Sequence, residues 1–238
     1  MEALLLSQGS LKRNLCVPAA ALRNRNGVKM RVTQIVELSK TRSKVYIEQE
    51  FAFVLYKGEL RLYHIREGEE LAEEDYNRIL GEVLPKRAKL RAMNLLKNRE
   101  YTTHQLRAKL KAGFYPEEVI DEALEYVASF HYTDDLRYAV DFISCYENRR
   151  SSRRINQDLQ AKGIDRDTIA QAWQEWENKG GKQDEQEMIA RLLEKKHFDS
   201  RTANFKEQQR MYAFLMRKGF QNDQIRRAIK FSEDDNWD

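Results

Sequence analysis

The sequence predicts a mainly α-helical protein in which a small β-rich segment precedes three tandem three-helix repeats. Hydrophobic residues make up 41% of the 238 residues and charged residues 34%, while Gly numbers 10 and Pro 3. This balance is typical of highly charged helical proteins rather than of sandwiches or barrels. β-Branched and aromatic residues with partial alternation are concentrated in residues 31–65. From Pro85 onward, one pattern of apolar positions occurs three times.

The first 29 residues differ from the rest in having no sustained hydrophobic periodicity. They contain five basic residues and one acid, Glu2, and the apolar run at residues 3–6 is too short for a signal-peptide core. We therefore expect residues 1–29 to be a flexible extension that the rest of the chain does not need for folding. A strand-like pattern begins at Met30, which makes Met30 a candidate natural start.

Residues 30–84 are predicted to form a small antiparallel sheet followed by a helix. The first two strands are residues 32–38 and 45–56, with a turn between them. Lys57-Gly58-Glu59 is predicted to be a tighter turn that leads into a third strand at residues 60–65. Because so small a sheet needs a packing partner, we expect the helix at residues 71–84 to cover it with its apolar face.

The repeat is defined by four apolar residues with the spacing 4, 10 and 4. Its three copies are Leu106, Leu110, Ile120, Leu124; Ile155, Leu159, Ile169, Trp173; and Met211, Leu215, Ile225, Ile229. Each copy contains a Gly followed by an apolar residue, namely Gly113-Phe114, Gly163-Ile164 and Gly219-Phe220. A Gly just past a helix end favours a left-handed cap, although Gly113 comes one residue early. Each copy is therefore predicted to be helix, turn, helix.

A further apolar helical segment precedes each pair, around Leu95, Phe142 and Leu192, which makes the unit a three-helix repeat. We expect the repeats at residues 85–135, 136–182 and 183–238, the last with an acidic tail. Since stacked repeats contact mainly their neighbours, they should form an elongated, curved array that presents a long surface rather than a pocket.

The stretch from Tyr132 to Ile143 connects the first repeat to the second. Thr133 or Asp134 can cap the following helix, and Tyr132 can close over its first turn as a hydrophobic staple. Two acids followed by Arg137 and Tyr138 are more than such a staple requires.

This junction, Y-T-D-D-L-R-Y-A, resembles the one between the first and second repeats of the RecX family, bacterial regulators of the RecA recombinase. Residues 98–114, N-R-E-Y-T-T-H-Q-L-R-A-K-L-K-A-G-F, resemble the first-repeat pattern of that family. R-I-N-Q-D-L-Q-A-K-G-I and F-L-M-R-K-G-F are similar to its second and third repeats. The β-rich segment is similar to the N-terminal extension of longer members.

The resemblance implies a non-enzymatic inhibitor that binds the groove or the end of the RecA–single-stranded DNA filament. Such a protein would limit filament growth, ATP hydrolysis and strand exchange. The alternative is a direct DNA-binding module of tandem helix-turn-helix-like repeats, which would bind DNA without RecA. The second helices of the first two repeats are acidic, so only residues 221–230 are a candidate recognition helix. A helical scaffold for another partner is the third interpretation.

Charge is segregated along the chain. Residues 86–111 contain nine Lys or Arg and one acid, whereas residues 117–135 contain seven acids and no Lys or Arg. This pattern predicts either oppositely charged faces that steer charged partners, or helix faces that pair with each other.

Three basic groups are candidate contacts with the filament, because guanidinium and ammonium groups bind phosphates and carboxylates. The densest is R-R-S-S-R-R at residues 149–154, while the others open the first repeat and occupy the last helix pair. The candidates are Arg149, Arg150, Arg153, Arg154, Lys86, Arg87, Lys89, Arg91, Arg217, Lys218, Arg226, Arg227 and Lys230. Each group can equally be ordinary solvated charge.

Aromatic residues at repeat positions are predicted to be core; they are Tyr101, Phe114, Tyr132, Phe142 and Phe220. Trp173 occupies a repeat core position, and Trp176 is predicted to be part-exposed. Trp237, in the acidic tail, is a candidate interaction handle.

Nothing in the sequence signals catalysis, a metal or a cofactor. His64, His104, His131 and His197 lack ligand spacing, and no C-x-x-C or phosphate-binding glycine loop is present. Cys16 and Cys145 lie far apart, which favours a reducing cytoplasm over a disulfide. No apolar run approaches the roughly 20 residues that span a bilayer, so we expect no contact with membranes. We also expect the protein to be a monomer.

Overall fold

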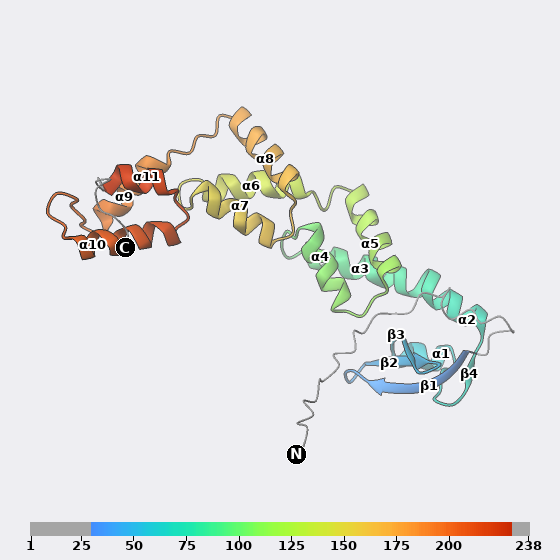
Figure 1. The fold of residues 1–238 in the computed structure, drawn as a ribbon. Helices are drawn as coiled ribbons and strands as arrows, with labels where there is room; N and C mark the ends of the chain where they lie inside the picture. Colours follow the sequence, from blue (N-terminus) through green and yellow to red (C-terminus); the bar gives the residue numbers. More distant parts are fainter. Residues whose placement is uncertain (1–29, 230–238) are drawn as a thin grey trace, which may run out of the picture. The chain divides into compact units, whose positions relative to one another are not determined.

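The computed structural model describes residues 30–229, which form two compact units (Figure 1). The first unit contains residues 30–99 and Leu106–Tyr132, and the second contains Glu100–Gln105 and residues 133–229. The predicted fold class is confirmed, since a small antiparallel sheet precedes three groups of three helices. The predicted N-terminal extension, Lys230 and the acidic tail with Trp237 lie outside the described residues.

The sheet contains four antiparallel strands in the order β3-β2-β1-β4. They are β1 (Met30–Glu37), β2 (Arg42–Ile47), β3 (Glu50–Tyr56) and the two-residue β4 (Glu70–Leu71). All residues from Phe51 to Leu55 are buried, so both faces of β3 are covered. This strand is therefore part of the hydrophobic core of the first unit.

The single strand predicted at residues 45–56 is wrong, because the chain reverses at Glu48 and Gln49. Both residues have positive φ, 47° and 68°, as a two-residue hairpin turn requires. Thr33 supports the turn by accepting a hydrogen bond from the Gln49 N–H at 2.9 Å. Such turns usually contain Asn or Gly, so the sequence carried no signal for this one.

The strand predicted at residues 60–65 and the turn before it are also wrong, because helix α1 (Lys57–Leu62) occupies this stretch. The Glu59 carboxylate accepts the Tyr56 N–H at 2.7 Å, which closes the first turn of the helix. Arg87 in turn holds the same carboxylate at 2.6 Å. A partner distant in sequence therefore stabilises a helix that local patterning did not indicate.

The helix predicted at residues 71–84 is part of a longer one. Helix α2 (Glu73–Arg78) continues through a π-helical turn, η1 (Ile79–Val83), into α3 (Leu84–Leu96). The turn ends two residues before Pro85, which has no N–H for the regular helical hydrogen bond. The predicted cover of the sheet is present, since Tyr76 is buried with its ring 5.9 Å from that of Phe53.

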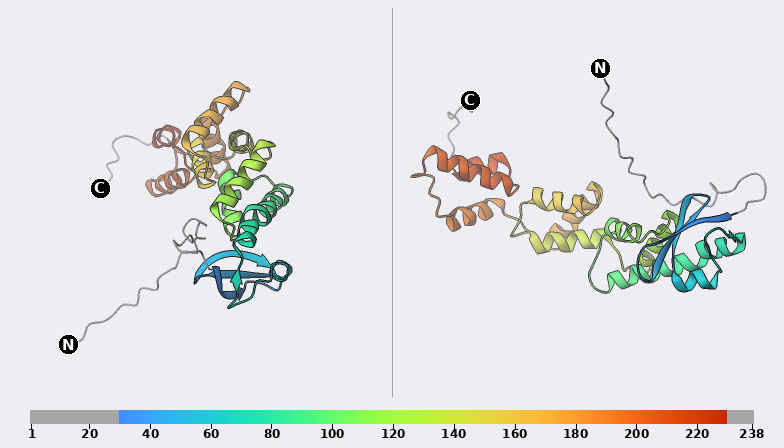
Figure 2. Two further views of the ribbon diagram at one scale, coloured as in Figure 1. Left: turned by 90° about the vertical axis from the view of Figure 1, so that its right-hand side faces the viewer. Right: turned by 90° about the horizontal axis from the view of Figure 1, so that it is seen from below.

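Three helices form each repeat, as predicted. The first repeat contains α3, α4 (Thr103–Lys111) and α5 (Glu117–Ser129); the second contains α6 (Asp135–Tyr146), α7 (Ser152–Ala161) and α8 (Arg166–Asn178); and the third contains α9 (Glu185–Lys195), α10 (Phe205–Arg217) and α11 (Asn222–Ile229). Figure 2 shows α9–α11, in orange to red, following α6–α8 within the second unit. Of the repeat-defining apolar positions, all except Trp173 and Met211 are buried.

The left-handed residue that ends the middle helix lies four residues after the repeat Leu in every copy. It is Phe114 in the first repeat, with φ 66°, then Gly163 with φ 85° and Gly219 with φ 92°. The prediction that Gly113 forms the first cap is therefore wrong, since position rather than residue type is constant. In the other two copies, Ile164 and Phe220 donate back to the repeat Leu carbonyl and are buried, as predicted.

We predict that Gly163→Ala destabilises the protein far more than Gly180→Ala. The two glycines have φ of 85° and 88°, so the backbone strain of an added Cβ is the same, about 1 kcal/mol. A Cβ on Gly180 would meet open space, whereas one on Gly163 would overlap Cβ of His104. The overlap should add about 2 kcal/mol.

Urea denaturation followed by circular dichroism measures the difference between the two variants. Equal losses of unfolding free energy would show that the contact between Gly163 and His104 is not close.

Candidate interaction surfaces

The four arginines of residues 149–154 divide into two pairs. Asp158 binds Arg150 at 2.6 Å and Arg154 at 3.1 Å, and the Arg150 guanidinium lies 3.8 Å from the centre of the Tyr146 ring. Arg149 and Arg153 are exposed and form no ion pair with any described residue. Among these four arginines, Arg149 and Arg153 are therefore the two whose guanidinium groups are fully available to a partner.

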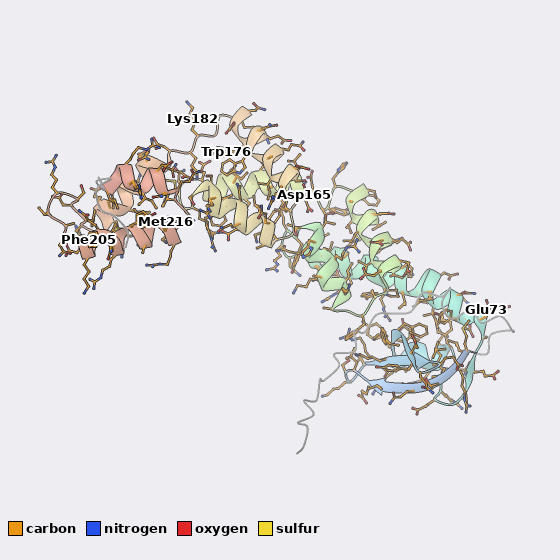
Figure 3. The ribbon with its side chains drawn as sticks, viewed as in Figure 1. Glu73, Asp165, Trp176, Lys182, Phe205 and Met216 are labelled. Atoms are coloured by element: carbon orange, nitrogen blue, oxygen red, sulfur yellow. The ribbon has the colours of Figure 1, made fainter. Side chains whose placement is uncertain are left out.

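Arg153 also lines a polar groove of about 600 Å³ between α7 and the third repeat. Its other lining residues include Asn156, Gln157, Met216 and Asn222. Met216, labelled in Figure 3, is 38% exposed and gives the groove one apolar contact. The groove therefore offers hydrogen-bonding groups beside an unpaired guanidinium.

The basic group that opens the first repeat divides in the same way. The Arg87 side chain, 17% exposed, donates to Glu59 and to the Val54 carbonyl, both at 2.6 Å. Lys89 binds Glu122 at 2.7 Å. Arg87 and Lys89 thus connect α3 to its neighbours, while Lys86 and Arg91 are exposed without an ion pair to a described residue.

The third basic group lies on the last helix pair. Arg217 and Lys218 are exposed at the end of α10, and the Lys218 carbonyl accepts a hydrogen bond from Ser151. Arg226 is half-buried, and Nε of Arg227 donates to the Asp223 carbonyl at 3.2 Å. Lys230, the last candidate, lies outside the described residues.

In the first repeat, basic residues of α4 form ion pairs with acidic residues of α5. Arg107 on α4 binds Glu117 at 3.1 Å and also binds Asp121, both on α5. Lys111 binds Glu117 as well. Of the two interpretations of this pattern, mutual pairing accounts for these residues. The hydrogen bond that Arg107 donates to Asp121 raises the pKa of Arg107, and the one that Lys111 donates to Glu117 lowers the pKa of Glu117.

The two acids of the Asp134-Asp135 pair cap two different helices. Asp134 caps its own helix α6 by accepting the Arg137 N–H at 2.9 Å. Asp135 accepts the Thr103 N–H, at the start of α4, at 2.8 Å. Tyr132 is not a buried staple, since it is 49% exposed. The second acid is therefore explained by a contact distant in sequence.

A buried hydroxyl completes this junction. Thr102 is fully buried; its Oγ1 accepts the Gln105 N–H at 3.2 Å and donates to the Lys162 carbonyl at 2.6 Å. The same atom therefore caps the start of α4 and satisfies a carbonyl at the end of α7. With Asp135 on Thr103, two hydrogen bonds hold this stretch within the second unit.

The same arrangement occurs a second time, at the start of α7. Ser151 is fully buried; its Oγ accepts the Arg154 N–H at 3.3 Å and donates to the Lys218 carbonyl at 3.1 Å. Glu185, at the start of α9, takes the place of Asp135 and accepts from N–H and Oγ–H of Ser152 at 2.6 and 2.7 Å. The second and third repeats are thus joined by a copied junction that sequence analysis missed.

Three of the four histidines have a structural role as left-handed residues. His64, His131 and His197 have φ of 49°, 55° and 52°. In each case the next N–H donates to a carbonyl five residues back, as in a helix-ending turn. His104 packs against Gly163. Among the described residues, no three His, Cys, Asp or Glu side chains gather as a metal site requires.

The tryptophan prediction is reversed. Trp176 is buried, with Nε1 donating to Glu147 at 2.8 Å and Gly181 packed on its ring. Figure 3 labels it near the C-terminal end of α8. Trp173 is only half-buried and donates to Asn156 at 2.7 Å. As predicted for the core, Phe220 is buried, whereas Tyr101, Phe114 and Phe142 are half-buried.

Comparison with known proteins places these repeats in one family. Models of the first, second and third three-helix domains of RecX match residues 88–126, 134–172 and 183–229. A protein named Regulatory protein RecX from Chromobacterium violaceum is 32% identical over 152 residues, which are 64% of this chain and 95% of that protein. The chain belongs to the RecX family. The three repeats described above are thus the three RecX domains.

Longer relatives and solved structures agree. Regulatory protein RecX from Caldanaerobacter subterraneus is 29% identical over 205 residues, 85% of this chain and 100% of that protein. A crystal structure of regulatory protein RecX has a TM-score of 0.52 at 22% identity and covers 84% of this chain and 98% of its own. At this identity the likeness concerns the fold alone.

Every described helix of the RecX chain is too short or too polar to span a bilayer.

We predict that Glu117→Gln destabilises the protein at neutral pH but not in acid. The pKa of Glu117 is lowered in the folded state, so its contribution is present above the ordinary Glu pKa near pH 4 and disappears as pH falls through the lowered value. Since the side chain is 43% exposed, we expect a loss of about 0.5 kcal/mol.

Denaturation of the wild type and the variant at neutral pH and near pH 2 measures this difference. Glu118→Gln is the matched control, because Glu118 is exposed without an ion pair to a described residue and should change nothing at either pH. A loss that persists unchanged in acid would show that the ion pairs are not its source.

Proposed function

We propose that this chain is a non-enzymatic inhibitor of RecA that binds the RecA–single-stranded DNA filament, in its groove or at its end. It would thereby limit filament growth, ATP hydrolysis and strand exchange. Membership of the RecX family supports the proposal, since its relatives are named regulatory proteins. We further propose that it acts as a cytoplasmic monomer, in keeping with the exposed thiol of Cys145.

The observation that carries the proposal is the junction between the second and third repeats, together with the exposed Arg149 and Arg153 beside it. The junction fixes α7 against the third repeat through Ser151, which is fully buried. Arg153 lies two residues further on, and Arg149 two residues before. Two free guanidinium groups are thus attached to a rigid point, which favours binding to the phosphates or carboxylates of a regular polymer.

The test is the DNA-dependent ATPase of RecA on single-stranded DNA with increasing amounts of this protein. We expect loss of activity. Loss well below one copy per RecA supports capping or disassembly, and loss only near saturation supports groove binding. No effect at any ratio would remove the proposed function. Equal binding to DNA without RecA would instead favour the direct DNA-binding module.

We predict that Arg149→Ala/Arg153→Ala weakens binding to the filament by about tenfold, since two charge-assisted contacts are lost. The stability of the protein should not change, because neither side chain pairs with a described residue. Fluorescence anisotropy on labelled filaments measures the affinity.

The matched control is Arg150→Ala/Arg154→Ala, which removes the same charge from the same segment. Because both arginines bind Asp158, this variant should lose about 1 kcal/mol of unfolding free energy. Equal binding losses in the two variants would mean that net charge, and not the two free arginines, determines affinity.

A further inference from the structure

Three aromatic side chains form an exposed ladder at the C-terminal end of α5. The rings of Tyr126 and Phe130 lie 5.1 Å apart and edge to face, and those of Phe130 and Tyr132 lie 5.9 Å apart and stacked. Phe130 is 55% exposed and Tyr132 is 49% exposed. We call Tyr126, Phe130 and Tyr132 the aromatic ladder.

The backbone holds the ladder in place. After α5 the chain turns through His131, with φ 55°, and the Tyr132 N–H donates to the Val127 carbonyl at 3.0 Å. This closed turn places the Tyr132 ring over Phe130. Two large rings are thereby fixed while about half of each stays in water, an arrangement that the core of the unit does not require.

The surroundings of the ladder are acidic. Glu118 and Glu122 precede Tyr126 by eight and four residues and so lie on the same side of α5, and Glu125 is its neighbour. Lys89 pairs with Glu122, but Glu118 and Glu125 are exposed without an ion pair to a described residue. The C-terminal end of the helix adds partial negative charge. This field repels phosphates and attracts cations.

We propose that the aromatic ladder, with Glu118 and Glu125, docks a basic segment of a protein partner in which Lys or Arg alternates with apolar residues. Cationic groups would lie over the exposed faces of Phe130 and Tyr132 and pair with the two carboxylates. Apolar side chains would cover the ring edges. One such contact already exists within the chain, where Nζ of Lys89 lies 5.2 Å from the centre of the Tyr126 ring.

This surface is distinct from the arginine pair proposed to contact the filament and does not depend on that function. The acidic side chains argue against nucleic acid, because an exposed aromatic platform for unpaired bases is normally set in a positively charged groove. Exposed Tyr and Phe rings beside carboxylates are instead what a basic protein segment recognises.

The experiment uses the full chain and three labelled probes in fluorescence anisotropy. They are a peptide of about 12 residues made of Arg-Leu-Ser triplets, the same peptide with Glu for Arg, and an oligothymidine of similar length. We expect saturable binding of the Arg peptide only. Phe130→Ser/Tyr132→Ser should weaken it by about tenfold, and Glu118→Lys/Glu125→Lys by about fivefold.

Leu62→Ser is the matched control, since Leu62 is also an exposed apolar residue, 69% exposed, but has no carboxylate-flanked ladder. Its affinity for the Arg peptide should equal that of the wild type. Circular dichroism melts check that each variant folds, and the charge variant provides a second test that leaves the rings intact.

Three results would overturn the proposal. The first is no saturable binding of the Arg peptide, or equal affinity in the Phe130→Ser/Tyr132→Ser variant. The second is oligothymidine binding that this variant abolishes, which would make the ladder a base-stacking platform. The third is concentration-dependent sedimentation of the wild type that the variant abolishes, which would make the surface a contact between copies of the chain.

Discussion

The second unit depends on a buried hydroxyl that both accepts and donates a hydrogen bond. Ser151 is fully buried, so its Oγ must find hydrogen-bond partners or destabilise the fold. It accepts the Arg154 N–H in the first turn of α7 and donates to the Lys218 carbonyl at the end of α10. Thr102 does the same with the carbonyl of Lys162. Because helix ends leave unpaired groups, one hydroxyl can satisfy two ends at once and fix their relative position.

The two turn glycines, Gly163 and Gly219, also make this junction possible, because they have no side chain. Gly163 and Gly219 must adopt positive φ to end their helices, and each also lies where another helix begins. A Cβ on Gly163 would overlap His104, and one on Gly219 would meet Ser151. The absence of a side chain therefore permits both the turn and the close approach that brings the carbonyl of the preceding residue, Lys162 or Lys218, to the hydroxyl. The second and third repeats can then keep separate apolar cores, since hydrogen bonds rather than a shared core join them.

Periodicity was sufficient to predict the helices and most of the repeat core, because 3.6-residue spacing reports burial directly. It failed where a distant group decided the local structure. Glu59 closes the first turn of α1 with a carboxylate that Arg87 also binds, and Gly181 packs on the ring of the buried Trp176. The junction was missed for the same reason. Its only local signal is that a hydroxyl pair and an acid pair recur in matching places, Thr102-Thr103 with Asp134-Asp135 and Ser151-Ser152 with Asp184-Glu185.

The density of charge in a sequence does not say which charges are available to a partner. In the densest basic group, one carboxylate, Asp158, takes up Arg150 and Arg154, whereas Arg149 and Arg153 pair with no described residue. On α5, Glu117 is likewise taken up by Arg107 and Lys111, whereas Glu118 beside it is exposed. Folding thus sorts neighbouring like charges into those that hold helices together and those that face solvent. Only the second kind can contribute its full charge to recognition, because it need not first give up a partner.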